Sequence, residues 1–142
     1  MTIAHTAPVP SAAAVRAAAQ RIAGTATRTP LRHSPALSAI AGGEVWLKLE
    51  TEQVTGSFKL RGAFNALSLL PAPARAAGVV ASSAGNHGLG VAFAAQALGI
   101  AATLFVPRTA PAVKREGIAA LGAHVDASAA DYDAAMVEAR AF

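Results

Sequence analysis

Residues 78–107 read "GVVASSAGNHGLGVAFAAQALGIAATLFVP", and this stretch decides the fold class. A short apolar run (78–83) is followed by a segment with helical spacing (86–99) and then by a second apolar run (100–107). A strand, a helix and another strand at this spacing are typical of a parallel sheet with a crossover helix. The sequence therefore predicts an α/β fold in which helices cover a parallel sheet.

The same alternation continues toward the end of the chain. Pro111 is placed to open a helix that ends at Gly122. A third strand is expected over 123–128 and a further helix over 130–142. We therefore interpret 71–142 as a small α/β domain that stops in mid-structure.

The first half of the chain is less regular. A helix capped by Ser11 is expected to close at Gly24, and Ser57 is expected to cap a helix near 58–69. The shorter elements expected between and after these helices are an extended segment at 26–34, a short helix at 35–41, a strand at 44–50 and a chain break at 71–78. We interpret 1–70 as part of a separate, larger domain.

Composition excludes several function classes. The 142 residues carry a net charge of +4, but their Lys and Arg residues are scattered, whereas a nucleic-acid-binding face would cluster them. Cysteine is absent, and no apolar stretch is long enough to span a membrane. The opening residues 1–15 do not have the pattern of a signal peptide, so we expect a cytoplasmic protein without nucleic-acid or membrane partners.

The first segment whose side chains could take part in catalysis or binding is "TGSFKLRG" (55–62). Lys59 and Arg61 stand at the start of a predicted helix, where the helix dipole disfavours cations. A desolvated lysine there would have a lowered pKa and could act as a nucleophile or a base. Gly56 and Gly62 would permit a close backbone approach. For a lysine taken by itself, however, an ordinary surface position on an amphipathic helix is the favoured alternative.

The second segment is "SSAGNHG" (82–88), between a predicted strand and a predicted helix. Backbone N–H groups at a helix start bind anions, and Gly85 and Gly88 would keep the approach open. The spacing matches neither a dinucleotide fingerprint nor a P-loop, and "GLG" (88–90) is too short to count. A turn capped by Ser83 or Asn86, with no ligand, is the alternative.

No metal site is expected. The four histidines have no metal-ligand spacing. They are His5, His33, His87 and His124.

Together these residues resemble a known family. The stretches "LKLETEQVTGSFKLRGAFNAL" (47–67) and 78–107 closely resemble the threonine/serine dehydratases among the fold-type II (tryptophan synthase β-like) pyridoxal phosphate enzymes. "RTPL" (28–31) and "TAPAVKREGIAALGAHV" (109–125) match as well. The resemblance implies the three-layer α/β/α architecture of that fold, represented by an N-terminal portion only.

The resemblance also implies roles for single residues. Lys59 would hold pyridoxal 5'-phosphate as a Schiff base, Phe58 would pack on the cofactor ring, and Asn86 would bind its 3-hydroxyl group. The loop that would grip the substrate carboxylate consists of Ser83, Ala84, Gly85, Asn86 and His87. A negatively charged cofactor nearby would offset the charge of Arg61.

The implied reaction removes the β-hydroxyl of L-threonine or L-serine and yields 2-oxobutyrate or pyruvate plus ammonia. In this reaction the freed amine of Lys59 takes the Cα proton. The resemblance also separates subfamilies: serine racemases have a second serine directly before the glycine that corresponds to Gly85, and this serine acts as acid and base on the other face of the substrate. This chain has Ala84 there, so racemisation is disfavoured. A 3-hydroxyaspartate dehydratase, a serine racemase and an inactive fragment that only binds or interacts remain the alternatives.

The resemblance further implies parts that lie beyond Phe142. These are the phosphate-binding loop, the partner of the pyridine nitrogen and any cation site. We expect the complete enzyme to be a homo-oligomer acting on a small amino acid.

Overall fold

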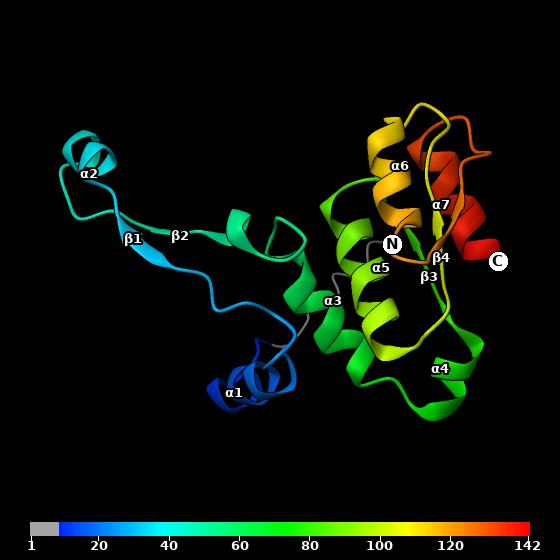
Figure 1. Ribbon diagram of the computed structural model, residues 1–142, viewed down its shortest axis with the longest axis horizontal. Helices are drawn as coiled ribbons and strands as arrows, with labels where there is room; N and C mark the ends of the chain where they lie inside the picture. Colours follow the sequence, from blue (N-terminus) through cyan, green and yellow to red (C-terminus); the bar gives the residue numbers. More distant parts are fainter. Residues whose placement is uncertain (1–8) are drawn as a thin grey trace, which may run out of the picture.

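The structure is a computed structural model that describes residues 9–142 (Figure 1). His5 and part of the stretch examined for a signal peptide lie outside the described residues. None of the helices within 9–142 is long and apolar enough to cross a membrane.

A three-stranded parallel sheet forms the centre of the second half of the chain, with strand order β3-β4-β5. Its strands are β3 (Val79–Ser82), β4 (Ala102–Phe105) and β5 (His124–Asp126). Its connecting helices are α5 (Asn86–Leu98), α6 (Ala112–Ala119) and α7 (Tyr132–Ala141). Helices α5 and α6 cover one face and α7 the other, so the predicted three layers are confirmed (Figure 1).

Helix α3 (Lys59–Ser68) adds a further apolar surface to this core. Its buried side chains are Leu60, Ala63, Phe64 and Leu67, spaced i, i+3, i+4 and i+7 along one stripe. This stripe packs on α5, which is consequently buried on two sides, by α3 and by the sheet. Helix α3, from the first half of the chain, thus shares one hydrophobic core with 79–123. The division of the chain into two domains at residue 70 stays a prediction.

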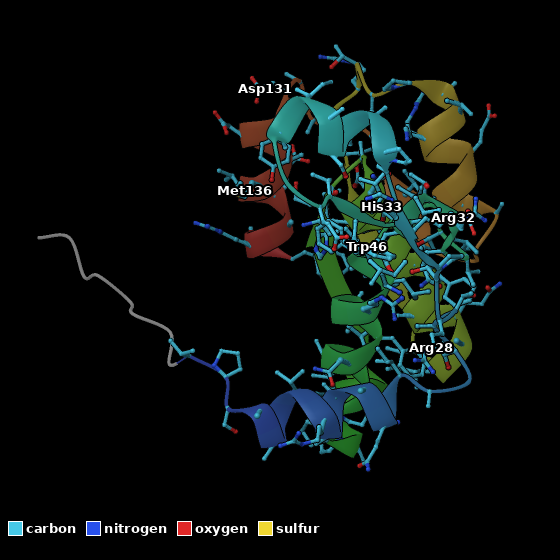
Figure 2. All side chains as sticks on the ribbon, turned by 90° about the vertical axis from the view of Figure 1, so that its left-hand side faces the viewer. Arg28, Arg32, His33, Trp46, Asp131 and Met136 are labelled. Atoms are coloured by element: carbon cyan, nitrogen blue, oxygen red, sulfur yellow. The ribbon has the colours of Figure 1, made fainter. Side chains whose placement is uncertain are left out.

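A slender arm extends away from this body (Figure 1). It consists of β1 (Leu31–His33), α2 (Pro35–Ala41) and β2 (Trp46–Lys48). The two strands pair antiparallel, with His33 opposite Trp46, and both rings lie together in Figure 2 with centroids 5.2 Å apart. All six strand residues are exposed, so the arm has no core of its own.

Helix α1 (Ala12–Arg21) lies beside α3. Ser11 caps it as predicted, since Ser11 Oγ accepts a hydrogen bond from the N–H of Ala14 at 3.2 Å. Arg21 Nε donates to Asn65 Oδ1 of α3 at 2.8 Å and links the two helices. The helix ends at Arg21, three residues before the predicted Gly24.

Two local predictions were wrong. The segment predicted as a break contains the short helix α4 (Ala72–Ala77), because Pro71 and Pro73 lie at its start, where a missing N–H costs nothing. The cap of α3 is Phe58 and not Ser57, although Ser57 Oγ still accepts a long hydrogen bond from the N–H of Lys59 at 3.4 Å.

Candidate active site

Lys59 is the first residue of α3, and its side chain is exposed. Its Nζ lies 5.0 Å from the centroid of the Phe58 ring, which is itself 59% exposed. A short 3₁₀ turn, η1 (Glu50–Glu52), and the loop after it lead into this helix, with Gly56 in the left-handed region at φ +69°. The next residue, Leu60, is completely buried, so exposed and buried side chains adjoin at the start of α3.

The start of α3 lies directly on α5 at Gly90. A Cβ atom at position 90 would lie 3.1 Å from Leu60 N, 3.1 Å from the Lys59 carbonyl carbon and 3.2 Å from its oxygen. Asn86 is one turn earlier on α5 and shares the face of Gly90, because residues i and i+4 lie above one another. The segments 55–62 and 82–88, which are separate in the sequence, therefore lie close together in the structure.

The loop before α5 is held by Ser83. Its Oγ accepts hydrogen bonds from the N–H groups of Gly85 at 3.3 Å and Gly88 at 3.2 Å. A Cβ atom at Gly88 would lie 2.2 Å from the Ser83 carbonyl oxygen, so this turn requires glycine. Ser83 thus stabilises the turn through its side chain, whereas the N-cap of α5 is Gly85 and neither Ser83 nor Asn86; the absence of a ligand stays a prediction.

That turn leaves two donors at the helix start unused. Within residues 9–142, the backbone N–H groups of Asn86 and His87 have no acceptor. Both residues are exposed, and the helix dipole adds partial positive charge at this end of α5. This combination of free N–H groups and dipole suits a carboxylate or a phosphate group.

His87 follows Asn86 in the first turn of α5. It lines a cavity of about 310 Å³ between α3 and β3, together with Gly62, Ala66, Val80 and Val91. Because the other lining residues are apolar, His87 is the polar residue of this cavity. His87 therefore belongs to two features, the start of α5 with its unused N–H groups and this neighbouring cavity.

Arg61 has a charged partner within the chain. Its Nε donates to Glu50 Oε2 at 2.9 Å and its Nη2 to Glu50 Oε1 at 2.8 Å. Nη2 also donates to the Thr27 carbonyl oxygen at 2.8 Å. The protein's own carboxylate thus balances this cation, and an effect of the cofactor on Arg61 stays a prediction.

Glu50 is the centre of this polar cluster. It also accepts a hydrogen bond from Thr29 Oγ1, and Lys48 Nζ lies 3.9 Å from Oε1. The hydrogen bonds from Arg61, aided by Thr29, outweigh partial desolvation and lower the pKa of Glu50 to about 2. The cluster joins the arm to α3 and fixes the segment that carries Lys59.

Of the glycines named from the sequence, Gly88 has tight surroundings, and Gly90 joins it. A Cβ atom at Gly62 or Gly85 would meet no atom within 4 Å, whereas Gly88 and Gly90 are buried against backbone. The "GLG" triplet dismissed as too short is therefore structural, and only the packing of α3 on α5 reveals it.

No group of three or more His, Cys, Asp and Glu side chains within 9–142 is arranged to hold a metal ion.

Comparison with known proteins identifies the family. Residues 22–142 match the family model described as pyridoxal-phosphate dependent enzyme. L-threonine ammonia-lyase of Thermotoga maritima is 48% identical over 111 residues, which are 78% of this chain and 28% of that protein. L-threo-3-hydroxyaspartate ammonia-lyase of Pseudomonas sp is 50% identical over 108 residues, 76% of this chain and 34% of that protein.

Solved structures of related enzymes also superpose on this chain. Maize serine racemase superposes with a TM-score of 0.83 at 37% identity, over 89% of this chain and 39% of that one. The processed form of threonine deaminase isoform 2 from Solanum lycopersicum superposes with a TM-score of 0.79 at 33% identity, over 93% and 40%. These likenesses confirm the predicted fold.

The chain spans about a quarter to a third of the length of these curated relatives. The family model, in contrast, matches most of the chain and both segments of the candidate site. The chain therefore belongs to the pyridoxal-phosphate-dependent enzymes, as its two motifs predicted.

Proposed function

We propose that the complete protein is an ammonia-lyase that removes the β-hydroxyl of L-threonine or L-serine, giving a 2-oxo acid and ammonia. The observation that carries this proposal is the contact of the Lys59 backbone with α5 at Gly90, one turn after the unused N–H groups of α5. An amine and an anion-binding helix start are what an enzyme acting on amino acids needs together. The names of the threonine ammonia-lyase and threonine deaminase relatives point to the same reaction.

The residues present fit pyridoxal phosphate. Two buried hydroxyl groups, Thr55 Oγ1 and Ser82 Oγ, have no hydrogen-bond partner within 9–142 and belong to the two segments of the site. Phe58 offers an exposed ring beside the Lys59 amine. When bound, the cofactor would supply a sink for the electron pair that proton removal leaves at the substrate Cα.

Lys59 would carry two roles. Its Nζ would hold the cofactor covalently, which its exposed position at the end of α3 permits. The same Nζ, once free, would take the Cα proton as a general base. Phe58 would pack on the cofactor ring, and the Asn86 amide would donate to the cofactor's 3-hydroxyl group.

The substrate carboxylate would be held by the loop at the start of α5. Its ligands would be the N–H groups of Asn86 and His87, with Ser83 fixing the turn and with Ala84 and Gly85 leaving room. A methyl side chain at Ala84 cannot donate or accept a proton. This supports elimination over racemisation, despite the likeness to serine racemase.

A second candidate has its own support. The relative that acts on L-threo-3-hydroxyaspartate, by its name, is 50% identical over the matched residues. Such a substrate carries an extra carboxylate, whereas Arg61 is already neutralised by Glu50. Arg61 is therefore not free to bind that extra carboxylate.

The first experiment adds pyridoxal phosphate to the complete protein and records the visible absorption spectrum. We expect an absorption band that disappears in Lys59→Ala but persists in Lys48→Ala and Lys114→Ala, the other two lysines of the chain. A band that survives Lys59→Ala, or no band at all, would contradict the assignment of Lys59.

The second experiment concerns the substrate. Ammonia release by the complete protein is measured with L-threonine, L-serine and 3-hydroxyaspartate, and release from the first two is expected to dominate. A cytoplasmic location, a homo-oligomeric complete enzyme and the division into 1–70 and 71–142 are part of the same proposal.

A further inference from the structure

We infer that Gly90 is a positioning residue for Lys59, because its missing side chain sets how closely the reactive end of α3 approaches the anion-binding end of α5. This inference rests on the proposed function, since it assigns Gly90 to the same site. Gly90 would touch neither cofactor nor substrate.

The contact at Gly90 involves backbone atoms only. A Cβ there would meet Leu60 N at 3.1 Å and the Lys59 carbonyl group at 3.1 and 3.2 Å. A flexible side chain could rotate away from such a contact, but the first turn of a helix cannot. An added methyl group must therefore displace backbone by a few tenths of an ångström.

The displacement would fall on α3 because α5 cannot retreat. The far side of α5 packs on the sheet, where Leu104 of β4 is completely buried, and Ala94 beside Gly90 is completely buried as well. There is also no room beside Gly88, where an added Cβ would lie 2.2 Å from the Ser83 carbonyl oxygen and 3.0 Å from Ile118 of α6. Moving the start of α3 moves Lys59 relative to Asn86.

Local stability alone would not select glycine at this position. Alanine is more favourable than glycine in a helix interior, and α5 contains alanine at several neighbouring positions. Gly117 of α6 provides the comparison, because a Cβ there would make an ordinary contact with the Leu89 side chain at 3.4 Å. The two glycines thus differ in what they touch.

The test compares Gly90→Ala with the control Gly117→Ala. The complete protein in each form is incubated with pyridoxal phosphate, reduced with borohydride and digested, and mass spectrometry gives the labelling of Lys59 relative to Lys48 and Lys114. We expect strong preference for Lys59 in the wild type and in Gly117→Ala. In Gly90→Ala the preference should fall by roughly threefold or more, because misplacing a reacting group by 1 Å costs about a hundredfold.

Far-UV circular dichroism of each variant separates the outcomes. An unchanged spectrum with reduced Lys59 preference supports the inference. Wild-type preference in Gly90→Ala would overturn it, and so would loss of the folded spectrum, which would make Gly90 a packing residue only. A wild-type chain that shows no preference for Lys59 would instead contradict the proposed function.

Discussion

Arg61 and Glu50 form a two-pronged ion pair at the base of the arm, with N–O distances of 2.9 and 2.8 Å. The pair explains why a cation is tolerated in the first turn of α3. It also lowers the pKa of Glu50 to about 2 from an ordinary value of 4.5, so the ionised form is bound more tightly in the folded state.

We predict that Glu50→Gln destabilises the protein by about 1.5–3 kcal/mol at pH 7, because Arg61 loses a charged partner. A lowered folded-state pKa contributes stability that is present above pH 4.5 and is lost as the pH falls toward 2. The difference between variant and wild type should therefore shrink over that range. Urea unfolding at several pH values measures it.

Glu52→Gln is the matched control for this prediction. Glu52 faces Arg32 at 3.7 Å, with both side chains well exposed, so its loss should change the free energy of unfolding by less than about 0.5 kcal/mol. Equal effects of the two substitutions, or a Glu50 effect that does not depend on pH, would show that the two-pronged pair is not stabilising.

Gln53 holds the segment before the arm. Its side chain is 4% exposed, and it both accepts from the Thr27 N–H at 2.8 Å and donates to the Thr27 carbonyl at 2.9 Å. Gln53→Ala leaves the Thr27 N–H without an acceptor, whereas the Thr27 carbonyl keeps its bond from Arg61, and the loss should cost about 1–3 kcal/mol in chemical denaturation. The exposed Gln96→Ala on α5 should be nearly neutral, and similar losses in both variants would count against the bridge.

Gly88→Ala should be strongly destabilising. The new methyl group would lie 2.2 Å from the Ser83 carbonyl oxygen, so the loop must deform, at a cost of about 1–3 kcal/mol or more. Gly117→Ala should instead stabilise by up to about 1 kcal/mol through helix propensity. Thermal unfolding followed by circular dichroism compares them, and equal melting temperatures would refute the steric argument.

Trp46 allows the arm to be followed by itself, because it is the only tryptophan in the chain. A two-stranded sheet without a core is marginally stable, so the arm should unfold at lower urea concentration than the body. Trp46 fluorescence should therefore change before the far-UV circular dichroism signal. The fluorescence of Tyr132 on α7, recorded in Trp46→Phe, should follow the dichroism, and coincident transitions of all probes would contradict this prediction.

Local patterns predicted the body of the fold well. The run from Val79 to Ala141 follows the expected order because its apolar strands and helical spacings can be recognised segment by segment. The error at α4 was also local in origin. Pro71 and Pro73 were interpreted as breakers, although the same residues favour the first turn of an alanine-rich helix.

Contacts between distant residues could not be predicted in this way. Glu50 reaches Arg61 only because η1 and the loop after it turn the chain back, and the sequence between them shows no pairing signal. The role of Gly90 likewise depends on the packing of α3 on α5. The motifs indicated which residues carry chemistry, whereas tertiary packing decides how they are held.

The base of the arm has one more consequence. The chain leaves the body after Pro30 and returns at Leu49, whose N–H donates to the Pro30 carbonyl at 3.0 Å. Residues 31–48 thus form an excursion of the chain whose two ends are neighbours. The entropy cost of closing such a loop changes only slowly with its length. The arm could therefore be replaced by a tight turn between Pro30 and Leu49 without changing the path of the backbone that carries Lys59.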